Sequence, residues 1–352
     1  MKQIILTGDR PTGRLHVGHY VGSLKERVRL QNSGKFDEIY IMIADAQALT
    51  DNADNPEKVR QNVLQVALDY LPWASTRQGT HLHPVHGAGA DRAELLLYEP
   101  RHRLPPAAQP HRQGRDPAEE LRVQHSGGFF TYPISQAADI TAFKATTVPA
   151  GEDQRPMIEQ CCEIVHKFNA VYGETLVEPE IVLPQNSACL RLPGTDGKAK
   201  MSKSLGNCIY LSDEPEDIKK KIMSMYTDPN HLRVQDPGKV EGNPVFIYLD
   251  AFSRPEHFAE FLPEYQNLDE LKAHYQRGGL GDVKVKKFLN SVMQAELEPI
   301  RSRRKEWEQR LPEVVEILKE GSAVAEKTAA ATLAEVRKSM KIDYFTDDNL
   351  LK

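Results

Sequence analysis

Two short segments of the sequence carry residue types that could act on a chain of phosphates. The first is Pro11–His19, with the sequence Pro-Thr-Gly-Arg-Leu-His-Val-Gly-His, where an expected strand turns into an expected helix. Backbone N–H groups at a helix start attract phosphate oxygens, and Gly18 has no side chain to keep an adenine ring from the backbone. The imidazoles of His16 and His19 can donate hydrogen bonds to phosphate oxygens as charge builds on them. The alternative is that both histidines are ordinary core or surface residues.

The second segment is Lys200–Ser204, with the sequence Lys-Met-Ser-Lys-Ser, and it follows a polar stretch that contains Gly194 and Gly197. Such a stretch predicts a loop. Two ammonium groups on a closing loop could meet a pyrophosphate as its bond to the α-phosphate breaks, which would stabilise the transition state more than the bound nucleotide. The alternative is a solvated basic loop. The presence of both segments in one chain favours phosphate chemistry.

A third set of polar side chains is formed by Tyr132, Gln136 and Asp139, at spacings of four and three residues. This spacing places the three on one face of a helix. Taken alone, such a face favours a partly buried polar stripe whose hydrogen bonds are satisfied within the protein.

The first segment is positioned by alternating strands and helices. We expect a buried strand at Gln3–Thr7, a turn at Gly8–Gly13, a helix from about Leu15 to Leu30, a strand at Glu38–Ala44 and a helix at Pro56–Leu71. The strands lack the polar and apolar alternation of half-exposed sheets, which is typical of a parallel sheet covered by helices on both faces. The predicted fold class is therefore α/β, with a Rossmann-like parallel sheet in the first half.

From Asp213 onward the pattern becomes helical, because Ile218, Ile222 and Met225 share one face of a helix. We therefore expect residues 1–207 to form the sheet domain and residues 208–352 to form an all-helical domain. The polar loop at 193–207 would lie at the junction, and it contains the lysine pair.

Composition restricts the class of protein without identifying it. The chain has 352 residues, 40% hydrophobic and 27% charged, and a formal net charge of −5, which leaves room for a local basic surface. No apolar run reaches the length of a membrane span and the first residues lack a signal-peptide pattern, so we expect a cytoplasmic protein with no membrane contact. The four cysteines show neither metal nor disulfide spacing, so we expect reduced thiols and no metal held by the protein.

Residues 73–127 depart from the rest of the sequence. Six of the twelve histidines and several prolines fall there, with little usable periodicity, and a loop of this length is unusual inside a compact domain. Three hypotheses compete: a metal site at His81, His83 and His86, an inserted flexible segment, or a stretch translated in a shifted reading frame. Permitted codons read from the second base give strand and helix patterns in two windows, 81–92 and 111–122. We favour the shifted frame.

The two phosphate segments together resemble the HIGH and KMSKS motifs of class I aminoacyl-tRNA synthetases, in the right order. Within that class the sequence is similar to the tryptophanyl-tRNA synthetases, through Pro11–Gly13, Tyr132–Ile140, Val148–Gln154 and Gly279–Lys284. The resemblance covers nearly the whole chain except 73–127. It implies a homodimer with a Rossmann catalytic core, Mg²⁺-ATP as co-substrate, L-tryptophan and tRNA(Trp) as partners, and a helical domain that binds the anticodon.

The resemblance also implies a role for individual positions. Catalysis is assigned to residues of the two motifs, namely His16, His19, Lys200 and Lys203. ATP contacts are implied at Gly8, Arg10, Pro11, Thr12, Gly18, His19, Gly151, Glu152, Asp153, Leu192, Lys200, Met201, Ser202, Lys203 and Ser204. Tryptophan contacts are implied at Tyr132, Gln136, Asp139, Gln154 and Gln47. Asp139 takes the indole N–H in the family, and a carboxylate suits that single donor.

The implied reaction has two steps. The carboxylate of tryptophan attacks the α-phosphate of ATP and releases pyrophosphate, and the ribose hydroxyl at the tRNA end then takes the acyl group. No protein nucleophile is needed, so that positioning and electrostatics supply the catalysis. RNA contact is expected at a basic cluster beside Trp307, formed by Arg301, Arg303, Arg304 and Lys305, and a plain solvated helix face is the alternative for this cluster.

Other functions remain open at this stage. Gln136 stands where many family members carry methionine, and Gln47 where many carry histidine. The spacing of Tyr132, Gln136 and Asp139 also resembles that of tyrosine-specific enzymes. Further alternatives are a nucleotidyltransferase that uses His-x-Gly-His without any tRNA, and a non-catalytic relative of the synthetases, which the unusual stretch at 73–127 favours.

Overall fold

The computed structural model describes most of the chain, and at 80–84 and 127–130 it describes the backbone alone. The described residues are 2–50, 52–73, 80–84, 127–183, 192–197, 199, 201–203 and 205–344. The three histidines of the hypothetical metal site and nearly all of the stretch at 73–127 have side chains outside this description. The hypotheses for that stretch are therefore addressed by sequence comparison alone.

The centre of the molecule is a five-stranded parallel sheet with the order β3-β2-β1-β4-β5. Its strands are β1 (Ile4–Asp9), β2 (Glu38–Ile43), β3 (Thr80–Pro84), β4 (Thr147–Pro149) and β5 (Glu180–Val182). The order reverses between β1 and β4. In open parallel sheets, such a reversal leaves a crevice at the carboxyl ends of the two strands, and ligands bind there.

The strands form where β-branched and apolar residues run without alternation. Ile5 in β1 and Ile43 in β2 are fully buried, as expected for strands covered on both faces. Gly8 lies very close to β2, because a Cβ added to it would be 2.4 Å from the carbonyl oxygen of Met42. Only glycine allows the end of β1 to approach β2 this closely. The Rossmann-like parallel sheet expected from the sequence is confirmed.

Helices connect and follow these strands. Before the lysine loop the structure has α1 (Val17–His19), the π-helical η1 (Tyr20–Leu24), α2 (Lys25–Asn32), α3 (Asp45–Leu49), α4 (Pro56–Tyr70), α7 (Gly127–Ala142), the 3-10 turn η3 (Glu152–Gln154) and α8 (Arg155–Tyr172). The helix expected at 15–30 is present, but the π-helical turn interrupts it. The start of α4 is fixed by Asn55, whose side chain accepts the N–H of Lys58, and by Pro56 at the first position.

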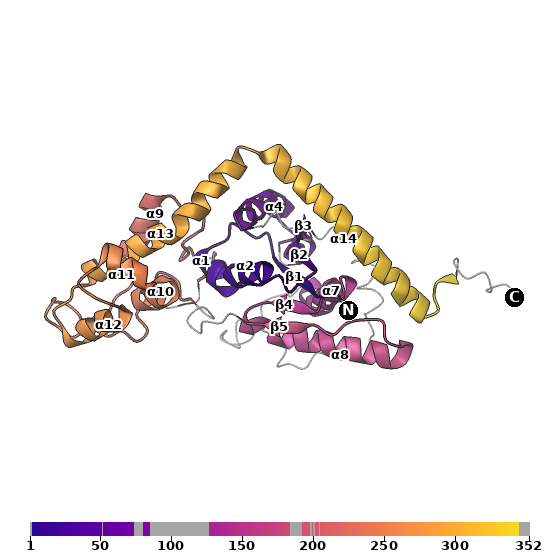
Figure 1. Cartoon of the computed structure of the whole chain (residues 1–352), viewed down its shortest axis with the longest axis horizontal. Helices are drawn as coiled ribbons and strands as arrows, with labels where there is room; N and C mark the ends of the chain where they lie inside the picture. The colour runs from indigo at the N-terminus through magenta and orange to yellow at the C-terminus, as the bar shows by residue number, and fades with distance from the viewer. Residues whose placement is uncertain are drawn as a thin grey trace.

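After the lysine loop, the described chain is helical, as expected. The helices are α9 (Pro215–Met223), α10 (Pro244–Phe252), α11 (Pro255–Phe261), α12 (Leu268–Arg277), α13 (Asp282–Glu308) and α14 (Leu311–Ser339). A proline at the first position begins α9, α10 and α11. Figure 1 shows α13 and α14 as two long limbs that meet at one end, with α9 to α12 gathered along α13 and with α14 running back past the sheet.

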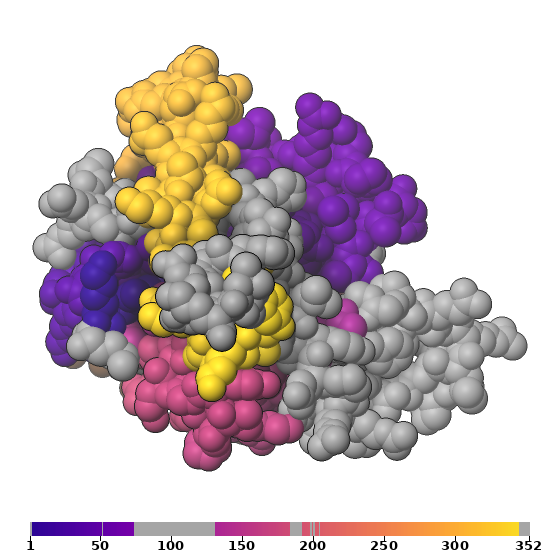
Figure 2. Space-filling view, turned by 90° about the vertical axis from the view of Figure 1, so that its right-hand side faces the viewer, coloured from indigo at the N-terminus to yellow at the C-terminus, as the bar shows by residue number. Residues whose placement is uncertain are grey.

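The hydrophobic core continues across the expected domain boundary at 207/208. One buried cluster includes Ile5 of β1 and Phe288 of α13. A second joins Ile4 of β1 with Ala329 and Val336 of α14. In the view of Figure 2, the yellow end of α14 lies against the pink residues of the α8 region. The last helix therefore packs on the sheet half of the molecule, while the boundary itself stays a prediction.

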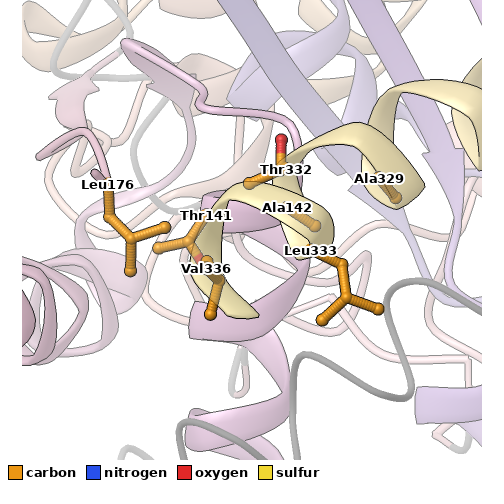
Figure 3. A pocket seen from close by; sticks show the side chains of 7 residues that line it. All are labelled: Thr141, Ala142, Leu176, Ala329, Thr332, Leu333 and Val336. Atoms are coloured by element: carbon orange, nitrogen blue, oxygen red, sulfur yellow. The ribbon is translucent and has the colours of Figure 1, made fainter. Parts of the chain in front are cut away.

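A small, mostly apolar pocket marks the place where α14 meets α7 (Figure 3). Its lining comes from three segments and consists of Thr141, Ala142, Leu176, Ala329, Thr332, Leu333 and Val336. This pocket is far too small for a nucleotide and belongs to the packing of the last helix.

Within the described ranges, no helix is long and apolar enough to cross a membrane. The same residues contain no group of three histidine, cysteine or carboxylate side chains placed to hold a metal ion.

Candidate active site

Segments that the sequence singled out follow the carboxyl ends of β1 and β4. The loop that leads to α1 follows β1 directly, and the turn η3 follows β4, capped by Gly151. Because these strands flank the reversal of the sheet, both segments face the position where open α/β sheets bind their ligands. Gly8 lies in β1, Arg10, Pro11 and Thr12 lie in the loop after it, Gly18 and His19 lie in α1, and Gly151, Glu152 and Asp153 lie at η3.

The two histidines of the first segment are held in the same tautomer by backbone hydrogen bonds. Nδ1 of His16 accepts the N–H of Gly18 at 3.1 Å, and Nδ1 of His19 accepts the N–H of His16 at 3.2 Å. A neutral imidazole that accepts at Nδ1 carries its proton at Nε2. The ring centroids lie 3.9 Å apart. The geometry thus supplies two neighbouring Nε2–H donors at the start of α1.

His19 stays uncharged at neutral pH. Burial lowers its pKa to about 4, Asp9 opposes this shift, and the positive charges of Lys203 and Arg27 add to it. An uncharged imidazole keeps its Nε2–H donor over the whole physiological range. The hydrogen-bond donor that the sequence predicted at this position therefore does not depend on protonation.

Beneath His19 lies a buried polar cluster that sequence reasoning missed, formed by Asp9, Arg27 and Tyr70. Arg27 pairs with Asp9 at 3.0 Å and donates to the carbonyl of Gly8 at 3.2 Å, while the Tyr70 hydroxyl donates to Asp9 at 2.7 Å. Burial raises the pKa of Asp9, but Arg27, His19 and Tyr70 together hold it below its ordinary value. The end of β1 therefore carries a fixed negative charge. An aspartate that ends an apolar strand was the available signal.

The lysine loop meets the first segment directly. Lys203 Nζ donates to the carbonyl of Gly13 at 2.7 Å, and a Cβ added to Gly13 would lie 3.0 Å from the Lys203 side chain. Gly13 has a φ of 152°, which also favours glycine. Burial lowers the pKa of Lys203, while Asp9 and Asp69 oppose the shift. Lys203 and Gly13 are separated by 190 residues in the sequence. The lysine loop and the first segment therefore meet in the folded chain.

Backbone pairing holds the two segments together beyond this contact. The N–H of Val17 donates to the carbonyl of Ile209 at 2.9 Å, and the N–H of Leu211 donates to the carbonyl of Leu15 at 3.0 Å. His16 forms an isolated antiparallel bridge with Tyr210. The exit of the lysine loop is therefore fixed to the start of α1.

The lysine loop is ordered by an asparagine that the sequence did not single out. Asn207 is buried, accepts the N–H of Ser202 at 2.8 Å and donates to Asp196 at 3.2 Å. The N–H of Met201 donates to the carbonyl of Leu192 at 3.3 Å, which places the expected contact Leu192 beside the loop. Lys200 and Ser204 lie outside the described residues.

The polar face of α7 is hydrogen-bonded to two other elements. Asp139 is 4% exposed and accepts a hydrogen bond from Nε2 of Gln47, which lies on α3, a helix that the sequence did not predict. Gln136 donates to Gln154 of η3 at 3.2 Å. The helix face expected from the spacing is thus joined to Gln47 and Gln154, and four of the expected tryptophan contacts form two bonded pairs.

Tyr132 connects this polar face to the nucleotide segments. It is half-buried, and burial raises its pKa, while Arg10 lowers the pKa and Asp153 raises it. Asp153 also accepts a hydrogen bond from Gln154 at 3.1 Å. Electrostatic and hydrogen-bond contacts therefore connect the loop after β1, through Tyr132 and η3, to the face of α7.

Two of the four residues expected to form a basic surface for RNA are buried, so the expected RNA contact is wrong for these two. Arg301 and Arg304 are each 3% exposed. Arg301 donates to the carbonyl of Asp213, and Arg304 donates to Asp69. Both guanidinium groups lie on the buried side of α13, where they hold other segments. Sequence spacing alone could not separate the buried and exposed sides here.

Comparison with known proteins adds to this geometry. The sequence model of the tRNA synthetases class I (W and Y) matches residues 1–76 and 118–298. The chain is 56% identical to the Tryptophan--tRNA ligase of Clostridium longisporum, over 98% of this chain and 99% of that protein, and 50% identical to the one of Streptococcus mutans over the same shares.

Solved structures agree with these relatives. The tryptophanyl-tRNA synthetase of Campylobacter jejuni, complexed with ADP and tryptophan, is 27% identical with a TM-score of 0.75, over 96% of this chain and 100% of that chain. The one of Mycoplasma pneumoniae has a TM-score of 0.74 at 22% identity, and both chains are covered over 100% of their lengths, which shows the same fold.

Proposed function

The chain belongs to the class I tRNA synthetases of the tryptophan and tyrosine group as a tryptophan–tRNA ligase, and we propose how its side chains divide the work of that reaction. The nucleotidyltransferase and the tyrosine-specific enzyme find no support among the relatives. ATP is the co-substrate, and Mg²⁺ enters with it, bound to the phosphates rather than to a site on the protein.

The first segment and the lysine loop act on the triphosphate. The Nε2–H groups of His16 and His19 donate to phosphate oxygens, and Lys203, together with Lys200 from the same motif, neutralises charge as pyrophosphate leaves. The observation that carries this proposal is the 2.7 Å hydrogen bond from Lys203 to Gly13, because it brings the lysine loop onto the segment that bears both histidines. Gly18 leaves space for adenine, and Gly151, Glu152 and Asp153 contribute further ATP contacts.

The face of α7 binds the amino acid. A carboxylate has about four lone-pair sites, so that Asp139 can accept an indole N–H as well as the bond from Gln47. Gln136 and Gln154 restrain each other through their hydrogen bond and complete the wall with Tyr132. Gln47 takes the place where many family members carry histidine, and it donates to Asp139 in that position.

The test is pyrophosphate exchange with ATP on the purified chain. Exchange that depends on tryptophan is expected, while tyrosine should support it at least a hundredfold less. Equal exchange with both amino acids would assign the chain to another specificity. Binding of tRNA without any exchange would support the non-catalytic alternative.

The stretch at 73–127 is best explained as a replacement rather than an insertion. The alignment with the relative from Clostridium longisporum spans 355 positions and covers almost all of both chains, which leaves no room for about 50 added residues. The family model nevertheless leaves residues 77–117 unmatched. The stretch thus keeps about the length it has in the relative, while its residues no longer match the family model. This combination supports translation of the stretch in a shifted reading frame. The nucleotide sequence is the test, because codons without a sensible product in another frame would dispose of this explanation.

The remaining parts of the proposal concern organisation. Residues 1–207 carry the ATP and tryptophan sites, residues 208–352 contact the anticodon of tRNA(Trp), and two chains form a homodimer in the cytoplasm. Sedimentation velocity of the purified chain checks the dimer, since a monomer at micromolar concentration would contradict it.

A further inference from the structure

The last turn of α4 holds both ends of the loop that leads to the histidines. Tyr70 donates to Asp9, at the end of β1. Asp69, the residue before it, accepts the backbone N–H of Leu15 at 2.7 Å, directly before His16. The path of the loop between Asp9 and Leu15 therefore depends on where α4 ends.

Asp69 is also tied to the helical half of the chain. Its side chain is fully buried, and its second oxygen pairs with Nη1 of Arg304 on α13 at 2.5 Å. The same guanidinium donates to the carbonyl of Gln65 at 3.1 Å and to the Gln65 side chain at 2.7 Å, one turn earlier on α4. Arg304 thus makes three hydrogen bonds to one helix, and one of them continues through Asp69 to the loop.

Leu15 is held from both sides by this arrangement. Asp69 holds its N–H, and its carbonyl accepts the N–H of Leu211 at the exit of the lysine loop. A shift of Asp69 would move Leu15, and with it both the histidines and the backbone pairing with residues 209–211. Lys203 lies within electrostatic reach of Asp69 as well.

Stability alone gives a weak reason for such a pair. Replacing a buried ion pair with apolar residues is often neutral or stabilising, because both charges lose their hydration. Burial raises the pKa of Asp69 to about 6, while Arg304 opposes the shift, so that the carboxylate is costly to keep ionised. A carboxylate that bridges α13 to the active-site loop is better explained by what it positions.

We propose that Asp69 and Arg304 form a positioning pair through which α13 sets the placement of the His16 and His19 segment for adenylate formation. The inference rests on the proposed function. Neither residue touches the substrates. Their effect is on the geometry of groups that do, and a displacement of about 1 Å at such groups costs on the order of a hundredfold in rate.

The experiment compares Arg304→Met with Arg254→Met by tryptophan-dependent pyrophosphate exchange. Arg254 also faces a buried carboxylate on α13, that of Glu296, which is 8% exposed, but it does not contact the loop. We expect Arg304→Met to lower kcat at least tenfold and raise the KM for ATP, with the Kd for tryptophan within twofold of wild type. Arg254→Met should lower Tm and leave kcat within twofold.

A double variant separates position from stability. In the double variant Asp69→Asn with Arg304→Met, no unpaired charge is left buried, but the link to α13 is still absent. The asparagine keeps an acceptor oxygen for the N–H of Leu15. We expect Tm to recover and kcat to stay low. Recovery of kcat together with Tm, or an equal loss of kcat in Arg254→Met, overturns the proposal. Absence of exchange in the wild type would instead refute the proposed function, so the two failures are distinguishable.

Discussion

Replacing Asp139 with alanine tests how the chain would select the indole ring. Asp139 is 4% exposed and is bonded to Gln47 on α3. A hydrogen bond to a buried charged group contributes about 1.5–3 kcal/mol, and a tenfold ratio corresponds to about 1.4 kcal/mol. Wild type should therefore prefer tryptophan over its benzothiophene analogue, in which sulfur replaces the ring N–H, by roughly 10- to 150-fold in kcat/KM.

The variant should lose this preference. Asp139→Ala removes the carboxylate acceptor whichever substrate is bound. The Gln47 amide also loses its acceptor with either substrate, so the cost of that loss cancels in the ratio of kcat/KM values. We expect the ratio of kcat/KM values in pyrophosphate exchange to fall to within threefold of one. Asp153→Ala is the control, because the proposed function assigns Asp153 to ATP, and it should keep the wild-type ratio. A ratio that survives in Asp139→Ala would refute the assignment of Asp139 to the indole N–H.

Three further predictions concern the nucleotide side. Lys203→Met should slow exchange by about 100-fold or more, the usual cost of losing one group that stabilises transition-state charge, while the tryptophan Kd measured by equilibrium dialysis changes less than twofold; equal losses would contradict the role. Asn207→Ala removes the hydrogen bonds to Ser202 and Asp196. It should raise the KM for ATP about tenfold, which corresponds to about 1.4 kcal/mol. An unchanged KM would contradict a role for Asn207 in ordering the loop. The pKa of His19, about 4 when folded, lies below its ordinary value, so the unfolded chain binds the proton first and stability should fall by up to about 3 kcal/mol as pH drops from about 6.5 to about 4. Denaturant titrations of wild type and His19→Asn should show that the variant loses this part of the pH dependence.

The sequence predicted the elements whose signals are local. Apolar runs predicted β1 and β2, the helix expected from Pro56 matches α4, and the helical character after Asp213 followed from periodicity. The spacing of the polar residues on α7 correctly predicted a shared face. These features depend on a few neighbouring residues, so that one sequence is enough to find them.

What the sequence could not give depends on contacts between distant segments. Nothing near Asp69 indicates that its partners are Leu15 and Arg304, because these lie 54 and 235 residues away. The same limit explains the mistaken RNA surface, since the charge of Arg304 is used inside the protein. A carboxylate within the apolar end of α4 did signal that a partner was needed, but not which one.

The packing of α14 against the sheet has a consequence for how the protein is made. Ile4 near the amino terminus shares a core with Ala329 and Val336, and the Tyr40 hydroxyl bonds to Thr328. During synthesis, the first strands leave the ribosome long before their last packing partner exists. Their apolar surface stays without this partner until α14 has been synthesised, and chaperones have that interval in which to act.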